Sequence, residues 1–290
     1  MITGTRAGSL TLAVVVIFIS ACDEQTATIN EESALRTASC ALSPTTLYNL
    51  TALANTIENQ TPGACPGGGL ILREESNADV RIVADHCVTT NNTTLQGSFY
   101  STQISATPAE YSLDFDQISL VDSNSGSQVD GEVRYLDTET NLEFVQNLSF
   151  DALQLQEIED TSVTTYLFAQ TDYSVTQSKA TSAATFDYHT TIELCGTDYF
   201  GLEVDTSEPL RQLESEASPS SGVVNVRAQD GSTLTITLQG DELDVLLDSN
   251  GDSVNDGQLS MTWGEAGVIT VASRQAAKAN MRLLPRFKSD

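Results

Sequence analysis

The feature that most constrains the fold is a period-two alternation of apolar side chains toward the C-terminal end. Successive side chains of a β-strand point to opposite faces, so alternation marks a strand with one buried face. Asp230-Gly231 and Gly240-Asp241 separate the runs and are typical hairpin turns. The pattern predicts an antiparallel meander. Its apolar positions are Val224, Val226, Leu234, Ile236, Leu238, Leu243, Val245, Leu247, Leu259, Met261 and Trp263.

Strand patterns of the same kind fill the chain after Gly67-Gly68-Gly69, which we interpret as a flexible lead-in. A hairpin around Ser76-Asn77 is expected to join 70–72 to 80–83, and a one-residue slip near Asp116 predicts a β-bulge. The further expected strands are 94–105, 111–120, 132–136, 142–155, 163–175 and 185–195.

One helix is expected before these strands. Ser43 can cap it, Pro44 suits its first position, and Thr61-Pro62-Gly63 ends it. Its apolar residues recur at helical spacing, as expected for a helix that packs on a sheet. They are Leu47, Leu50, Leu53 and Ile57. We therefore expect an all-β fold, an antiparallel β-sandwich or partly open barrel with one N-terminal helix and a short C-terminal basic helix.

Composition divides the chain into segments. Residues 23 to about 39 are polar and acidic, so 22–39 is expected to be a tether. A helix-plus-β domain is expected over 40–206. The Ser-, Glu- and Pro-rich stretch 207–221 is a loop or linker, and 222–273 is a meander in the same domain or a second small β unit. Residues 274–290 form a basic tail.

The N-terminal residues are typical of an export signal. One positive side chain, Arg6, precedes the mostly apolar run 10–19, which is too short to span a bilayer as a helix. Ile19-Ser20-Ala21-Cys22 follows, and this resembles the lipobox of bacterial lipoproteins. The resemblance implies cleavage after Ala21 and acylation of Cys22; the alternative is an ordinary secretory signal. Asp23 resembles the enteric signal for retention in the inner membrane, so we expect a lipid-anchored protein on its periplasmic face rather than in the outer membrane.

If Cys22 is acylated, four cysteines remain for disulfides in an oxidising periplasm. Pairing position 72 with position 80 centres the hairpin at 76, and the same symmetry sets Cys65 opposite Cys87. This leaves Cys40 with Cys195. A Cys40–Cys65 bridge is the competing possibility.

The charge balance excludes one class of partner. The formal net charge is −27, and it becomes −28 (12 basic minus 40 acidic residues) after removal of 1–21, which contains Arg6 and no acid. Nucleic acid phosphates would be repelled by such a body, so no nucleic acid partner is expected. Cations are favoured over anions.

An Asp-rich loop is the best candidate for a metal. Calcium prefers six to eight oxygen ligands, and alternate oxygen-bearing side chains in 248–256 could supply several. The spacing resembles EF-hand and thrombospondin type 3 loops at Asp248, Asn250, Asp252 and Asp256. Ser253 and Leu259 depart from that pattern. No cofactor is required, and calcium is a possible one; the alternative is a polar hairpin loop.

The tail 274–290 carries a stripe of basic residues at steps of four, namely Arg274, Lys278, Arg282 and Arg286. If helical, these residues lie on one slowly drifting face. Contact with anionic lipid headgroups is one interpretation. Docking onto the acidic body is the other.

Catalytic signals are weak. The chain has two histidines, His86 and His189, and His189 shares a polar strand face with Asp187, Thr191 and Glu193. It contains no Gly-x-Ser-x-Gly elbow, no His-Glu-x-x-His sequence and no phosphate-binding glycine loop. Whether the protein is an enzyme stays open, and the sequence gives no catalytic residue.

The body resembles β-rich, uncharacterised lipoproteins of proteobacterial envelopes, on the basis of the lipobox, the cysteine-bearing hairpin, the meander and the Asp-rich loop. The resemblance implies no established activity. We expect a lipid-anchored periplasmic binding or scaffolding protein, anchored through Cys22 and with an envelope protein as a possible partner. The alternatives are an envelope hydrolase using His189 and a carrier of lipids or lipoproteins.

Overall fold

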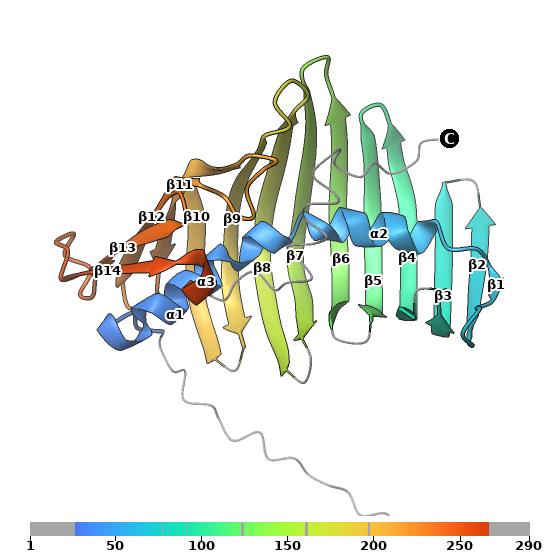
Figure 1. Ribbon diagram of the computed structural model, residues 1–290, viewed down its shortest axis with the longest axis horizontal. Helices are drawn as coiled ribbons and strands as arrows, with labels where there is room; N and C mark the ends of the chain where they lie inside the picture. Colours follow the sequence, from blue (N-terminus) through green and yellow to red (C-terminus); the bar gives the residue numbers. More distant parts are fainter. Residues whose placement is uncertain are drawn as a thin grey trace, which may run out of the picture.

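All strands in the part of the chain that the structure describes form one antiparallel sheet. The computed structural model describes residues 27–76, 78–90, 92–122, 125–159, 162–196 and 198–266 of the 290-residue chain. Within this part, 14 strands pair in the order of the sequence, and the sheet does not close (Figure 1). The strands are β1 (Gly63–Ala64), β2 (Leu70–Ser76), β3 (Asp79–Val88), β4 (Thr94–Ala106), β5 (Ala109–Val121), β6 (Ser125–Glu139), β7 (Glu143–Glu159), β8 (Ser162–Ser178), β9 (Ala184–Cys195), β10 (Asp198–Gln212), β11 (Ser221–Arg227), β12 (Thr233–Gln239), β13 (Glu242–Asp248) and β14 (Gly257–Thr262).

The expectation of an all-β antiparallel fold is confirmed. Of the two expected forms, the partly open one is closer, because the structure has a single open sheet and not two facing sheets. Of the loop or linker predicted for 207–221, a loop is present over residues 213–220, and residues 207–212 belong instead to β10. β10 runs to Gln212 and β11 begins at Ser221 in the same sheet, so only a short loop separates them and the late meander is continuous with the earlier strands.

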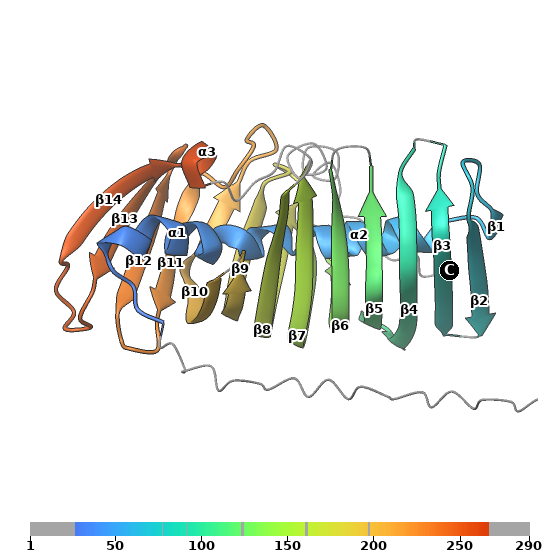
Figure 2. The same ribbon diagram turned by 90° about the horizontal axis from the view of Figure 1, so that it is seen from below.

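The helices form one rod that crosses the strands (Figures 1 and 2). The rod consists of α1 (Glu31–Leu42), the 3-10 turn η1 (Ser43–Thr46) and α2 (Asn49–Glu58), while the short α3 (Trp263–Ala266) follows β14. None of the helices in the described part of the chain has the length and apolar character that crossing a bilayer requires.

Contacts along the rod fix its course over the sheet. The α1 residue Cys40 is bonded to Cys195 of β9, and the hydroxyl of Tyr188, also on β9, donates to the carbonyl of Ala41 at 3.1 Å. At the far end, the Arg73 guanidinium of β2 donates to the carbonyl of Glu58, the last residue of α2. The rod therefore reaches from the C-terminal half of the sheet to its N-terminal edge.

The predicted tether is wrong over residues 31–39, which belong to α1. Asn30 and Ser33 form a capping box, each side chain accepting from the other residue's backbone N–H at 3.0 Å. Glu31 and Glu32 lie in the first turn, where negative charge is favoured. Ser43 is not the N-cap that was predicted. It is the C-cap of α1 and the first residue of η1, and its hydroxyl donates to the carbonyl of Cys40.

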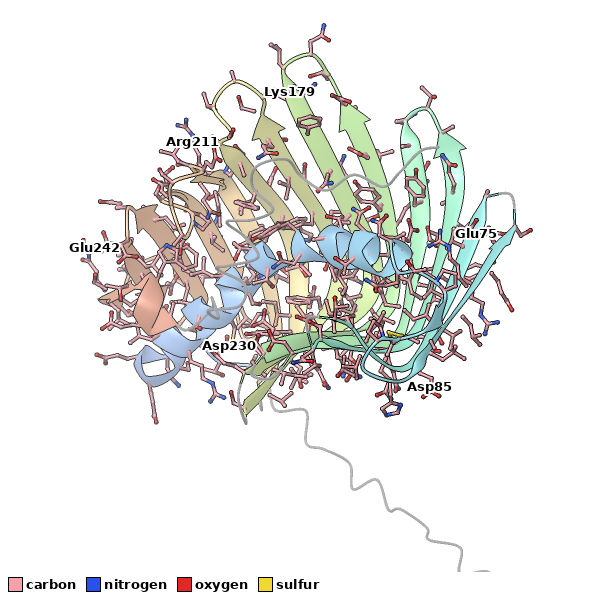
Figure 3. The ribbon with its side chains drawn as sticks, turned by 45° about the vertical axis from the view of Figure 1, so that its right-hand side comes forward. Glu75, Asp85, Lys179, Arg211, Asp230 and Glu242 are labelled. Carbon is pink, nitrogen blue, oxygen red and sulfur yellow. A yellow bond between two sulfur atoms is a disulfide. The ribbon has the colours of Figure 1, made fainter. Side chains whose placement is uncertain are left out.

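A line of bulges creases the sheet. The pairing register shifts between neighbouring strands at Ala84/Cys87 in β3, Phe115/Ile118 in β5 and Ala169/Asp172 in β8. In β7 the buried positions are even-numbered from 144 to 150 and odd-numbered from 153. The predicted bulge near Asp116 is confirmed as one part of this line. Because bulges bend strands, the row folds the lower part of the sheet beneath the helices (Figure 3).

Glycines face the bulges. Gly97 of β4 has φ +110°, and a Cβ there would lie 2.5 Å from the carbonyl oxygen of Gln117 in β5. Gly131 of β6 has φ +135°, and a Cβ there would lie 2.8 Å from the carbonyl oxygen of Ala152 in β7. Only glycine combines this backbone conformation with such a close approach. The bent sheet encloses one contiguous apolar core that includes residues of α1, α2 and α3 and of nearly every strand.

Both expected disulfides are present, but the register that led to one of them is wrong. Leu72 pairs with Val83, not with position 80, and strand symmetry alone would not bring Cys65 to Cys87. The chain instead turns back between β1 and β2. Gly69 lies so close to the bulge of β3 that a Cβ would be 2.1 Å from the carbonyl oxygen of His86. The glycine run is therefore a tight turn, not a flexible lead-in.

Candidate functional site

The polar face of the sheet is the candidate site. On β9, Phe186 and Tyr188 are buried and point to the helices, so the alternating Asp187 and His189 point to the opposite face. We call this opposite side of the sheet the outer face. No helix of the described chain packs on it, since the rod lies on the other side.

A depression of about 600 Å³ lies on the outer face between β5 and β10. The strand register places His189 directly between Asp172 of β8 and Asp205 of β10. Directly opposed residues have Cβ atoms about 5 Å apart, so both carboxylates lie near the imidazole. The lining residues are Pro108, Glu110, Arg134, Leu136, Asn147, Leu148, Ser149, Asp172, Tyr173, Ser174, Asp187, Tyr188, His189, Asp205 and Thr206.

A second depression, of about 730 Å³, adjoins the first along the crease and shares Arg134, Ser149 and Asp172 with it. It adds the carboxylates of Glu132 and Asp151. Acidic side chains crowd its β5–β6 border. There, burial raises the pKa of Asp114, and the neighbouring carboxylates of Glu132, Asp116 and Asp130 raise it further. This region of the outer face is therefore strongly negative.

Positive charge on this face is scarce. Of the described residues that line the two depressions, Arg134 alone is a Lys or Arg, and its guanidinium is paired with Glu110. Lys179 lies at the far end of the long strands, where its Nζ is 2.6 Å from Glu139, and Arg211 lies toward the same side of the molecule (Figure 3). The arrangement suits a ligand or partner that presents cationic groups.

The depression lacks a formed nucleophile–base pair. His189 makes no hydrogen bond or ion pair with any residue of the described chain, and the hydroxyls of Ser149 and Ser174 do not donate to it. Nucleophilic catalysis needs such a pair within hydrogen-bond reach. Thr206 donates to Asp187 instead. The site offers polar groups for binding, and His189 and the neighbouring carboxylates are groups of the kind that perform general acid–base chemistry.

The predicted calcium loop is folded by its own hydrogen bonds. The carboxylate of Asp248 is 5% exposed and accepts the backbone N–H groups of Gly251 and Ser253, both at 2.7 Å, as well as two longer bonds from the same loop. Asp256 accepts from the N–H and hydroxyl of Ser249, and these bonds lower its pKa. Asn250 and Asp252 likewise accept backbone N–H groups two residues ahead.

These bonds close the loop, and they occupy side-chain oxygens that a calcium ion would otherwise bind. Across residues 27–266, as far as the structure describes them, no three His, Cys, Asp or Glu side chains are grouped to hold a metal ion. Calcium binding in this loop stays a prediction.

The other predicted site residues fall in different places. Cys22 and the basic residues Arg274, Lys278, Arg282 and Arg286, with the predicted C-terminal helix, lie outside the described residues. His86 is exposed beside the Cys65–Cys87 bridge, and its Nδ1 lies 2.9 Å from Asp85.

Sequence reasoning singled out His189 but missed its cross-strand neighbours Asp172 and Asp205. Alternation places a residue on a face of its own strand, but the register between strands decides which residues meet. No local signal in the sequence gave that register.

Comparisons with protein-family models, with curated proteins and with solved structures found no match for the chain. The function must be inferred from the residues and their geometry.

Proposed function

We propose that this protein is a lipid-anchored binding or scaffolding protein of a bacterial cell envelope, held by acylated Cys22 on the periplasmic side of the inner membrane. The observation that carries the proposal is the state of the cysteines. Cys40 is bonded to Cys195, and Cys65 to Cys87. Disulfides persist in exported proteins, and their formation leaves Cys22 as the one cysteine available for a lipid.

The outer face supports binding as the role of the body. It carries two adjoining depressions with six carboxylates and one arginine, which is already paired. The inner face is filled by the helices and by buried side chains such as Phe99, Phe168 and Phe186. A partner would therefore bind the outer face, and an envelope protein with an exposed basic surface suits its charge.

Acylation is tested by radiolabelled palmitate. The wild-type protein should take up the label and fractionate with membranes, while Cys22→Ala should lose both properties. The variant should keep its two disulfides, because Cys22 takes no part in them. Absence of label from the wild-type chain would overturn the anchor. Asp23→Ser tests the choice of membrane, and we expect it to move the protein toward the outer membrane.

Partner binding is tested by site-specific photocrosslinking in native envelopes. A photoreactive residue at Ser174 lies in the depression, and a matched one at Leu142 lies 74% exposed in the turn between β6 and β7. We expect a discrete protein adduct from position 174 that is missing from position 142. Equal adducts at both positions, or none at 174, would contradict a role of the outer face in binding.

The depression also gives a second candidate function some support. An envelope hydrolase would use His189 as a general acid or base beside Asp172 and Asp205. Purified wild-type protein and His189→Asn should then differ in turnover of ester and amide probes. Equal rates for the two proteins would remove this candidate. The carrier hypothesis has no support from the described interior, which is packed with side chains.

A further inference from the structure

The outer face is an unpartnered sheet face whose occupant can be sought within the chain itself. Its two depressions span β5 to β10, and six carboxylates line them: Glu110, Glu132, Asp151, Asp172, Asp187 and Asp205. The only Lys or Arg among the described lining residues, Arg134, is paired with Glu110. Five carboxylates are therefore left without a lysine or arginine in the lining.

The complementary charge lies at the C-terminal end of the chain. Residues 22–290 contain twelve Lys and Arg, and five of them fall in the last 17 residues. These five are Arg274, Lys278, Arg282, Arg286 and Lys288. This segment is the densest concentration of positive charge in the sequence.

The length of chain after α3 is sufficient to bring this charge to the face. α3 ends at Ala266, next to β14, and four strand spacings of about 4.8 Å, or roughly 19 Å, separate β14 from β10. The chain must also round the sheet edge, because the carbonyl of Ala266 accepts a hydrogen bond from Ser39 of α1 on the inner side. Residues 267–290 are 24 residues, and a chain of this length can span at most roughly 79 Å, which exceeds the path required.

We propose that residues 274–290 dock across the two acidic depressions of the outer face, so that the C-terminal segment is the resident occupant of this surface. The inference rests on the proposed function only in using the same face, and it is independent of acylation. A partner at this face would have to displace the segment.

Zero-length carbodiimide crosslinking tests the docking. The full mature protein, purified in detergent and kept dilute, is treated with the reagent and mapped as peptides. We expect amide links within one chain from Lys278 or Lys288 to Asp172, Asp187 or Asp205. In a variant with those three aspartates changed to Asn, the amount of crosslinked Lys278 and Lys288 should fall at least tenfold.

A matched variant keeps the test specific. Glu74→Gln, Glu75→Gln and Asp79→Asn together remove the same charge at the opposite end of the sheet, and they should leave the links unchanged. If the aspartate variant fails to fold, Lys278→Glu with Arg282→Glu supplies the test, and the remaining lysine, Lys288, should lose its links.

Three results would overturn the proposal. Links could spread evenly over the acidic residues of the body, or they could occur only between two chains. The segment could instead bind vesicles containing phosphatidylglycerol and give no links to the face in their presence, which would identify the membrane as the occupant. In each case the palmitate result for Cys22 would still stand, because it does not depend on the segment.

Discussion

The two disulfides should differ in how much they stabilise the fold. Cys40–Cys195 closes a loop with a sequence separation of 155, while Cys65–Cys87 closes one with a separation of 22. A bridge limits the conformations of the unfolded chain, and the limit is greater for the longer loop. The long bridge also joins α1 to β9, and so ties the helical rod to the middle of the sheet.

The chain-entropy relation gives the expected sizes. At 25 °C it assigns about 5 kcal/mol to the 155-residue separation and about 3.4 kcal/mol to the 22-residue separation. The short loop lies inside the long one, and subtracting its residues lowers the first value by only about 0.1 kcal/mol. The double substitution Cys40→Ala with Cys195→Ala should therefore cost about 1.5 kcal/mol more than Cys65→Ala with Cys87→Ala.

Urea unfolding of the mature protein under oxidising conditions, followed by circular dichroism, measures both losses. The slopes of the transitions should be compared as well, since removing a crosslink exposes more surface in the unfolded chain. Reduced wild-type protein should match the variant that lacks all four cysteines. A larger loss from the Cys65–Cys87 pair would refute the loop-length reasoning and would place the stabilisation in local packing around β1 and β2.

Two further substitutions test the crease of the sheet and a half-buried carboxyl group. Gly97→Ala should destabilise the fold by about 2 kcal/mol or more in urea unfolding, because its Cβ would clash with the carbonyl of Gln117. The control Gly240→Ala has no atom within 4 Å of the new Cβ, so it should cost about 1 kcal/mol for its positive φ alone. Burial, with a smaller effect of a neighbouring carboxylate, raises the pKa of Glu157 to about 7. The folded state thus holds this proton more tightly than the unfolded chain, so Glu157→Gln should exceed the wild type in urea midpoint above pH 7, and the difference should shrink as the pH falls from 7 toward 5. The exposed control Glu143→Gln should show no such trend.

The strands were predictable because the alternation of apolar and polar residues lies within the sequence of each strand. Val224 and Val226, like Leu234 and Ile236, are buried as alternation predicts, and the slip after Phe115 identified a bulge. The register of β2 on β3 was not predictable in the same way. It depends on turn geometry at the hairpin tip, where the sequence offered only polar residues, and the expected pairing was wrong by three positions.

The first helix was missed because its buried face is made of small residues. Ala34, Ala38 and Ala41 lie against the core, and alanine gives a weak apolar signal in an acidic, Ser-rich stretch. The usable signal was the cap: Asn30 and Ser33 stand three residues apart, with glutamates between them. Small residues also allow the helix to approach the sheet closely. The alanines that weaken the apolar signal of α1 in the sequence are therefore the residues that let it pack.

The open sheet must cover its apolar face without the second sheet that a sandwich would supply. A sheet with one apolar face needs a covering layer. Here the helical rod covers the middle of the inner face, and the crease turns the lower strands so that Val129, Leu153 and Phe168 join the same core as the helices. The crease depends on bulges and facing glycines that lie at the same level in several strands. Only the register between the strands shows that they are aligned. Because the inner face is covered within the chain, the outer face is left as a broad negative surface, and Asp172, His189 and Asp205 are brought together there by pairing rather than by any local motif.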